Sequence, residues 1–167
     1  MKRCLAGRRI LVTGASGGIG QSIAEQAAAK GAKVALAARS ADKLAEIVGR
    51  IRASGGMAEA IVTDITSREG RSRLLASIAE RWGGVDILVN NAGIGSFGHF
   101  AESSEDVLRQ IMEVNFFAPA ELIRLALPIL KEGVQPAIVN VASMCGRRGR
   151  TGLVGIQCQQ VCRHRPE

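Results

Sequence analysis

A glycine-rich segment near the start of the chain has the composition of a phosphate-binding turn. Residues 13–20 read Thr-Gly-Ala-Ser-Gly-Gly-Ile-Gly, between a short aliphatic run and a helical pattern. Glycines allow a tight turn and let backbone amides approach a pyrophosphate, while the helix N-terminus favours its negative charge. A flexible turn would also use glycines, but the position between strand and helix favours dinucleotide binding. We assign this role to Gly14, Ser16, Gly18, Ile19 and Gly20.

Two further side chains follow expected strands and are placed to recognise the adenosine of a dinucleotide. The second strand is followed by Arg39; an acid there would accept from ribose hydroxyls, whereas an arginine can pair with a 2′-phosphate. The sequence therefore favours NADP(H) over NAD(H), unless Arg39 is simply a solvated loop residue. Asp64 follows the third strand and can accept from an adenine amino group, although a role in capping the next helix is nearly as well supported.

A third group of polar and small residues follows the fourth expected strand. Residues 90–93 read Asn-Asn-Ala-Gly. Ligands of open parallel sheets bind at the carboxyl ends of the strands. Small or amide-bearing side chains there can hydrogen-bond backbone and cofactor without blocking the cleft. We therefore add Asn91, Ala92 and Gly93 to the cofactor-binding residues.

Short aliphatic runs alternate with longer helical patterns, and these elements must bring the three groups together. Strands are expected at residues 9–13, 33–38, 57–62, 86–89 and 137–141. Helices are expected at residues 18–30, 42–53, 67–82 and 104–130. Capping serines open the last helix, and Pro119 should bend it. Apolar strands separated by helices indicate an α/β fold with a Rossmann-like, doubly wound parallel sheet.

Length, charge and cysteine content exclude several classes of protein. The chain has 167 residues, and none of its apolar runs approaches the roughly 18 residues of a membrane span. Its net charge of +7 is concentrated in residues 1–9 and 147–150 without interleaved aromatic residues, which argues against nucleic-acid binding. The first residues lack the apolar core of a secretory signal, so we expect a cytoplasmic protein with reduced cysteines.

A small cluster of potential zinc ligands lies near the end of the sequence. Cys158, Cys162 and His164 could supply three ligands. Zinc sites normally pair two ligand clusters at defined separations, and no second cluster accompanies this one. We therefore expect no metal site.

Several motifs in order resemble the short-chain dehydrogenase/reductase family from about Arg8 to Gly146. These are the glycine-rich turn, Asn-Asn-Ala-Gly, Asn115 in Glu-Val-Asn-Phe-Phe, and Ser143 in Ile-Val-Asn-Val-Ala-Ser. The resemblance implies a nicotinamide cofactor, hydride exchange with a small-molecule alcohol or carbonyl substrate, and a homo-oligomer. It also implies that Ser143 hydrogen-bonds the substrate oxygen and that Asn115 holds a water in a proton relay.

The residues expected to complete such an active site are missing. The family places a tyrosine thirteen residues after the serine, and four residues later a lysine that binds the nicotinamide ribose and lowers the phenol pKa. Here those positions hold Ile156 and Gln160, and the chain has no tyrosine at all. Isoleucine has no proton to donate, and glutamine has no charge with which to stabilise a phenolate. We expect impaired or absent turnover, and the alternative function is a non-catalytic NADP-binding module.

Two explanations of this departure compete: divergence of a non-catalytic relative, and a reading-frame shift near Gly149. Read one nucleotide later, the codons of residues 153–162 can encode Trp-Ser-Glu-Tyr-Ser-Ala-Ser-Lys-Phe-Ala. This reading puts tyrosine at position 156 and lysine at position 160. It requires ATA as the codon of Ile156 and CAA as the codon of Gln160. We favour the frame shift, and any other codon at either position would exclude it.

The chain is expected to divide into an NAD(P)-binding Rossmann domain, residues 1–145, and a non-family tail, residues 146–167. The tail has neither a helical nor a strand pattern, so we expect it to be poorly ordered. In the family, the segment after the serine forms a helix that covers the sheet and pairs between subunits. Without it the sheet is incomplete at its C-terminal side, and an exposed edge strand favours aggregation. We therefore expect a marginally stable chain; a cooperative, monomeric thermal unfolding transition would contradict this.

Overall fold

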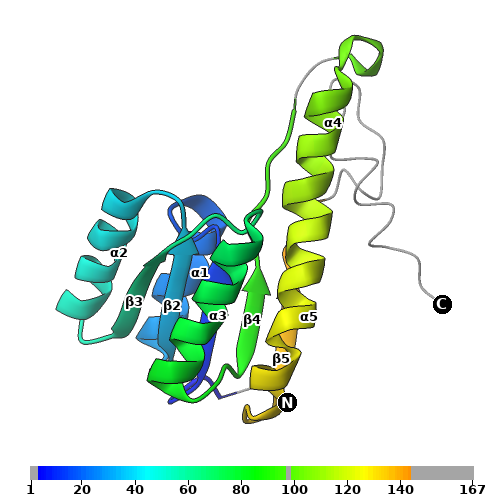
Figure 1. Ribbon diagram of the computed structural model, residues 1–167. Helices are drawn as coiled ribbons and strands as arrows, with labels where there is room; N and C mark the ends of the chain where they lie inside the picture. The colour runs from blue at the N-terminus through cyan, green and yellow to red at the C-terminus, as the bar shows by residue number, and fades with distance from the viewer. Residues whose placement is uncertain (1–3, 97–98, 144–167) are drawn as a thin grey trace.

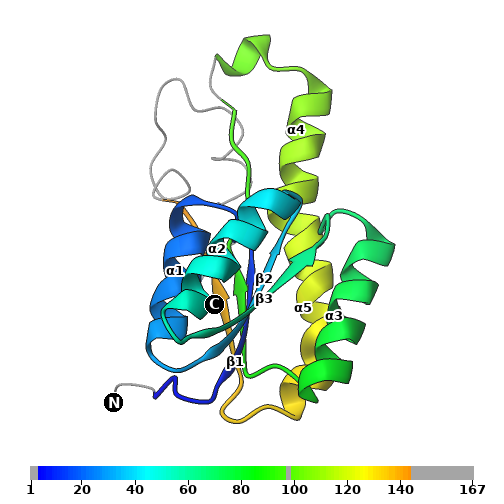
Figure 2. The ribbon, with the colours of Figure 1, turned by 90° about the vertical axis from the view of Figure 1, so that its left-hand side faces the viewer.

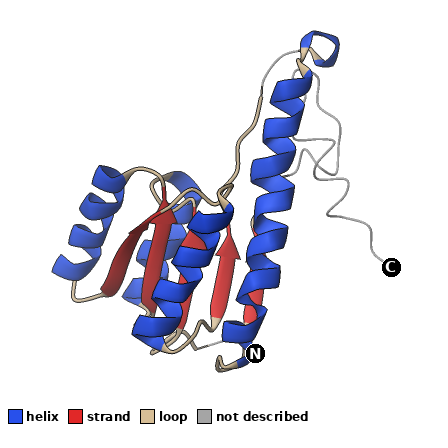
Figure 3. Cartoon of the chain, in the orientation of Figure 1, coloured by secondary structure: helices blue, strands red, loops and turns tan. Residues whose placement is uncertain are grey.

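Five parallel strands form the centre of the protein in the computed structural model, which describes residues 4–96 and 99–143 (Figures 1 and 3). The strands are β1 (Arg9–Thr13), β2 (Lys33–Ala38), β3 (Met57–Val62), β4 (Ile87–Asn90) and β5 (Ala137–Asn140). Their order in the sheet is β3-β2-β1-β4-β5, and every neighbouring pair is parallel. The chain thus crosses from one side of β1 to the other between β3 and β4. This confirms the predicted Rossmann-like, doubly wound sheet; the tail, residues 146–167, lies outside the described residues.

Helices cover both faces of the sheet. On one face lie α1 (Gly18–Ala29) and α2 (Ala41–Ala53), and on the other lie α3 (Arg68–Trp82) and α5 (Ala118–Lys131) (Figure 2). Ile10 and Val12 of β1 belong to the core with α1 and α2, whereas Leu11 belongs to the core with α3 and α5. All three side chains are buried, as expected of a parallel strand covered on both sides.

The long helix expected over residues 104–130 consists of three segments. These are α4 (Glu105–Met112), a π-helical turn η2 (Glu113–Phe117) and α5, and a 3₁₀ turn, η1 (Phe100–Glu102), precedes them. Ser104 caps α4, because its hydroxyl accepts a hydrogen bond from the Val107 N–H at 3.3 Å. The irregularity precedes Pro119 instead of being centred on it: the Ala118 N–H donates to the Glu113 carbonyl, five residues back. Pro119 has no N–H with which to continue α-helical pairing at this point.

A buried carboxylate joins the amino ends of β1, β4 and β5. Asp86 is 2% exposed and accepts hydrogen bonds from the Arg9 backbone N–H at 2.7 Å and the Arg9 guanidinium at 2.8 Å. It also accepts from the Val134 N–H at 2.6 Å, in the connection before β5. The Arg9 guanidinium donates further to the Trp82 carbonyl at the end of α3. The Arg9–Asp86 ion pair therefore links β1, β4, the connection before β5 and the end of α3, at the edge of the sheet where the strands begin.

Replacing Asp86 with asparagine should cost about 3 kcal/mol of folding free energy at neutral pH, because the partly buried Arg9 loses its counter-charge. Burial alone would raise the pKa of Asp86, but hydrogen bonds from Arg9 and Val134 outweigh it and lower the pKa to about 2. The stability supplied by this depressed pKa is present above the unfolded value near 4 and is lost as the pH falls through about 2, roughly 2 kcal/mol in all.

Urea unfolding at neutral pH and at pH near 2 measures both effects. The Asp86→Asn variant should lack this component of the acid destabilisation that the wild type shows. Asp42→Asn, at an exposed position in α2, is the matched control and should keep it. Equal acid destabilisation in wild type and Asp86→Asn would show that the ion pair does not carry this part of the stability.

β5 lies at the edge of the described sheet and pairs there with β4. Its apolar side chains are poorly covered: Ile138 is 38% exposed and Val139 is 45% exposed. This exposure agrees with the expected open edge, while marginal stability stays a prediction. None of the described helices combines the length and the apolar character that crossing a bilayer requires.

Candidate functional site

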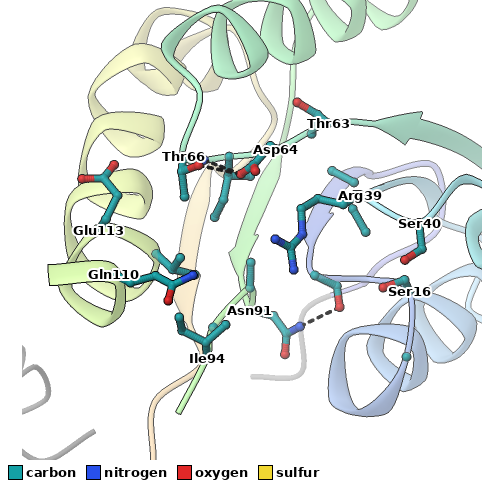
Figure 4. A pocket seen from close by; sticks show the side chains of 18 of the residues that line it. Ser16, Arg39, Ser40, Thr63, Asp64, Thr66, Asn91, Ile94, Gln110 and Glu113 are labelled. Carbon is teal, nitrogen blue, oxygen red and sulfur yellow. Dashed lines mark hydrogen bonds between the residues drawn. The ribbon is translucent and has the colours of Figure 1, made fainter. Parts of the chain in front are cut away.

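A cavity of about 750 Å³ opens at the carboxyl ends of the strands, between the sheet and α4 (Figure 4). All three groups of residues predicted from the sequence contribute to its lining. The predicted residues that line it are Gly14, Ser16, Arg39, Asp64, Asn91, Ala92 and Gly93. This volume is within the usual range for small-molecule and cofactor sites.

The glycines of the first turn have distinct structural roles. Gly14 has φ +64°, and a β-carbon there would lie 2.7 Å from the Ala92 Cα. A β-carbon at Gly20 would collide with the Asn91 side-chain nitrogen and lie 2.5 Å from the Gly14 carbonyl oxygen. Gly18 has φ +55° with open space beside it, so its conformation and not its packing favours glycine. Ile19, in the first turn of α1, has a side chain that is 63% exposed.

Thr13 and Asn91 lock this turn to the end of β4. The Thr13 hydroxyl accepts from the backbone N–H groups of Asn91 at 3.1 Å and Ala92 at 3.2 Å, and donates to the Val89 carbonyl at 3.3 Å. The Asn91 amide donates to the carbonyls of Thr13 at 3.0 Å and Gly14 at 3.1 Å. The Asn91 side chain thus holds the start of the glycine-rich turn next to the end of β4. Sequence reasoning missed Thr13, whose signal is a hydroxyl at the end of an otherwise aliphatic strand.

Arg39 and Asp64 lie on the side of the cavity formed by β2 and β3 (Figure 4). The Asp64 carboxylate accepts from the Thr66 N–H at 2.9 Å and the Thr66 hydroxyl at 2.8 Å. These hydrogen bonds, the backbone one above all, lower the pKa of Asp64, and the positive charge of Arg39 lowers it further. Asp64 is therefore an ionised acceptor at the cavity wall. The cap of α3 is Ser67 instead, whose hydroxyl accepts from the Gly70 N–H at 3.0 Å.

Asn115 lies in η2 and fixes the segment that follows β4. Its side-chain oxygen accepts from the Ile94 N–H at 2.8 Å, and its side-chain nitrogen donates to the Ile94 carbonyl at 2.7 Å. Ser143 follows β5, and the pairing of Asn90 with Asn140 puts it at the same edge of the sheet as the cavity. Ser143 is not among the residues that line this cavity. The roles of Asn115 and Ser143 toward a substrate stay predictions.

One wall of the cavity was not predicted from the sequence. It is formed by Arg109, Gln110, Glu113 and Val114, which share one face at the junction of α4 and η2. Their helical spacing, just before Asn115, is the signal that could have found them. Thr63 also lines the cavity, and its buried hydroxyl has no hydrogen-bond partner within the described residues.

The remaining predicted residues lie outside the described part of the chain. These are Ile156 and Gln160, at the positions of the expected tyrosine and lysine, and the potential zinc ligands Cys158, Cys162 and His164. Within residues 4–96 and 99–143, no three His, Cys, Asp or Glu side chains are grouped as metal ligands would be.

Comparison with known proteins agrees with this geometry. The chain is 39% identical over 145 residues to the ketoacyl reductase HetN of a Nostoc species. The aligned region covers 87% of this chain and 50% of that protein. The 3beta-hydroxysteroid dehydrogenase of Mediterraneibacter gnavus is 36% identical, covering 84% of this chain and 51% of that protein. The chain therefore spans about half the length of these curated relatives.

Two solved structures have closely similar folds. The L-sorbose reductase of Gluconobacter frateurii, complexed with NADPH and L-sorbose, has a TM-score of 0.88 at 30% identity, covering 94% of this chain and 60% of that one. A short chain dehydrogenase/reductase of Burkholderia phymatum, in complex with NAD, has a TM-score of 0.90 at 30% identity, covering 96% and 57%. The family described as short chain dehydrogenase matches residues 8–155. With its glycine-rich turn, Asn-Asn-Ala-Gly segment and parallel sheet, the chain belongs to the short-chain dehydrogenase/reductase family.

Proposed function

We propose that the chain derives from an NADP(H)-dependent oxidoreductase that exchanges a hydride between the nicotinamide and a small alcohol or carbonyl substrate. The observation that carries the preference for NADP(H) is Arg39 at the cavity, beside Ala38 and Ser40, with no carboxylate among the lining residues that follow β2. A guanidinium pairs with a 2′-phosphate, and a carboxylate at this point would repel it.

The cavity fits such a cofactor on structural grounds. Nothing lies within 4 Å of a β-carbon added at Gly17 or Gly18, so the start of α1 is open at these positions, where its backbone amides would approach a pyrophosphate. The ionised Asp64 would accept from the adenine amino group, and Arg39 would hold the 2′-phosphate. When bound, the nicotinamide supplies or accepts the hydride. The solved relatives are mixed, one with NADPH and one with NAD, so the preference rests on Arg39.

Catalysis by this chain is proposed to be impaired. Ser143 would hydrogen-bond the substrate oxygen, and Asn115 would hold the water of a proton relay, as the family implies. With Ile156 and Gln160 in place of tyrosine and lysine, neither position supplies an acid for the proton transfer, a contribution of roughly 10²- to 10⁴-fold in rate. The alternative is a module that binds NADP(H) without catalysis. The cytoplasmic location and the homo-oligomer stay predictions.

Replacing Arg39 with methionine tests the cofactor preference. The variant should bind NADPH about 10- to 100-fold more weakly, because a charge-assisted pair with the 2′-phosphate is lost. Its affinity for NADH should change by less than about threefold, since NADH has no 2′-phosphate. Fluorescence titration of the reduced nicotinamide measures both dissociation constants.

Arg109→Met is the matched control for Arg39→Met. Arg109 lines the same cavity, but its side chain is 75% exposed and paired with Glu105. This variant should leave the ratio of the two dissociation constants unchanged. Equal weakening of NADPH and NADH in Arg39→Met would contradict the proposed 2′-phosphate contact, and absence of binding in the wild type would contradict the proposed function.

A further inference from the structure

Arg71 is a buried arginine that forms no ion pair in the described part of the chain; the carboxylate on which it acts electrostatically, that of Glu121, is paired with Arg124. It lies in the first turns of α3 and is 7% exposed, and none of the ion pairs among the described residues includes it. Its buried Nε has no hydrogen-bond partner there. Arginine is rarely buried to this extent without an ionic partner, because desolvation of the guanidinium is costly. Such a residue requires a specific explanation.

The guanidinium is bound to the loop that joins β3 to α3. Its Nη1 donates to the Ile65 carbonyl at 2.6 Å and to the Thr66 carbonyl at 3.0 Å. Two consecutive carbonyls of the loop are therefore held by one cation. Hydrogen bonds from an ionised donor are stronger than neutral ones, so this contact restrains the loop more than ordinary backbone pairing would.

Gly70, the residue before Arg71, packs directly against the same loop. A β-carbon at Gly70 would lie 2.5 Å from the Asp64 carbonyl oxygen and 3.0 Å from the Thr63 hydroxyl. Any larger residue would push the loop away from α3. Close packing at Gly70 and the hydrogen bonds of Arg71 thus act on adjacent residues of one short segment.

The restrained loop is also a wall of the cofactor cavity. Its residues Thr63, Asp64, Ile65 and Thr66 all line the cavity, whereas Arg71 does not. Thr66 holds the Asp64 carboxylate by two hydrogen bonds, so displacement of Thr66 would move that carboxylate as well. The position of the Asp64 carboxylate at the cavity wall therefore depends on Arg71, which does not line the cavity.

We propose that Arg71 is a positioning residue for adenosine recognition, which holds the carbonyls of Ile65 and Thr66 so that Asp64 faces the adenine of the cofactor. This inference rests on the proposed function, since it requires a dinucleotide in the cavity. It assigns Arg71 no contact with cofactor or substrate. Its effect is on the affinity for the adenosine half of NADP(H), because Asp64, the proposed acceptor of the adenine amino group, lies in this loop.

The experiment measures binding of 2′,5′-ADP, the adenosine half of the cofactor, by calorimetry with the full 167-residue chain. Arg71→Met should raise the dissociation constant about tenfold or more, because two charge-assisted hydrogen bonds to the loop are lost. Arg71→Lys keeps one cationic donor and should fall between methionine and wild type. Arg73→Met, at an exposed position of the same helix, should bind like the wild type.

Binding is measured at a temperature where circular dichroism shows each variant to be fully folded. Lower stability alone does not change the dissociation constant of the folded state. Amide hydrogen exchange of residues 64–66 should become faster in Arg71→Met and remain unchanged in Arg73→Met. Faster exchange confined to this loop is not expected from a general loss of stability.

The outcomes separate the inference from the proposed function. If wild type does not bind 2′,5′-ADP, the proposed function fails. If wild type binds and folded Arg71→Met binds equally well, the inference alone is overturned. Should Arg71→Met not fold, Arg71→Lys decides: weaker binding supports the inference, and an unchanged dissociation constant overturns it.

Discussion

Restoring the reading frame at the Arg150 codon is expected to raise carbonyl-dependent oxidation of NADPH by about 10²- to 10⁴-fold. If the codons of Ile156 and Gln160 are ATA and CAA, as the frame-shift hypothesis requires, deleting one nucleotide there puts tyrosine at position 156 and lysine at position 160. The phenol then supplies a proton to the substrate oxygen, and the lysine charge lowers the phenol pKa toward neutrality. Absorbance of NADPH at 340 nm, with a panel of aliphatic ketones and aromatic aldehydes, measures the rate.

Two controls test whether the tyrosine itself is responsible. The corrected gene with phenylalanine encoded at position 156 keeps the ring and loses the hydroxyl, so its rate should fall back by a similar factor. Ile156→Tyr with Gln160→Lys in the uncorrected chain should restore less, because the neighbouring residues from Leu153 to Cys162 keep the shifted sequence. An uncorrected chain that reduces ketones as fast as the corrected one would contradict the proposal that catalysis by this chain is impaired.

The Gly14→Ala variant should bind NADPH about 100-fold more weakly, the largest loss that we expect from a single cofactor-site change. Two costs combine at this position. A left-handed conformation costs a non-glycine residue about 1–2 kcal/mol, and here φ is +64°. The added β-carbon would also lie 2.7 Å from the Ala92 Cα, so the turn and the end of β4 must separate.

A series of three glycines separates these two costs. Gly17→Ala adds a methyl group in open space. Gly17 has extended backbone with φ 172°, and apart from its chain neighbours no atom lies within 4 Å of the added carbon. Gly18→Ala adds the left-handed strain without a collision, since its φ is +55°. Thermal unfolding should rank wild type and Gly17→Ala highest, Gly18→Ala lower and Gly14→Ala lowest. Equal stability of Gly14→Ala and Gly18→Ala would show that the segment after β4 moves away from the added methyl group without loss of folding free energy.

Most strands could be predicted because their apolar runs are local in the sequence, and their alternation with helices indicated a doubly wound parallel sheet. The runs at residues 9–13 and 33–38 are apolar enough to be buried on both faces, the run at residues 57–62 is half-buried, and the structure has strands with all three bounds. The glycine-rich turn was equally readable, because the positive φ of Gly14 and Gly18 and the close approach of Gly14 and Gly20 to the segment after β4 favour glycine. Asn91 to Gly93 line the cavity, since parallel strands end at one edge, and their role in cofactor binding stays a prediction.

What could not be predicted depends on contacts between distant segments. The π-helical turn at Glu113–Phe117 has no local signature apart from the following proline. Arg71 has the pattern of a solvated helix residue, and its burial follows from how α3 packs on the β3 loop. The hydroxyl of Thr13 becomes a structural centre because β4 lies beside β1, although 76 residues separate it from Val89.

The Asn115 side chain forms the hydrogen bonds with Ile94 that a neighbouring strand would otherwise form. Its amide donates to the Ile94 carbonyl and accepts from the Ile94 N–H, which is the pair of hydrogen bonds that a peptide group of an adjacent strand would provide. The backbone beyond β4 is therefore satisfied by a helix side chain, with no further strand needed beside it. The chain can thus leave the sheet at this point without leaving the N–H and carbonyl of Ile94 unpaired. Aspartate, nearly identical in shape, could not serve, because it cannot both donate and accept while ionised.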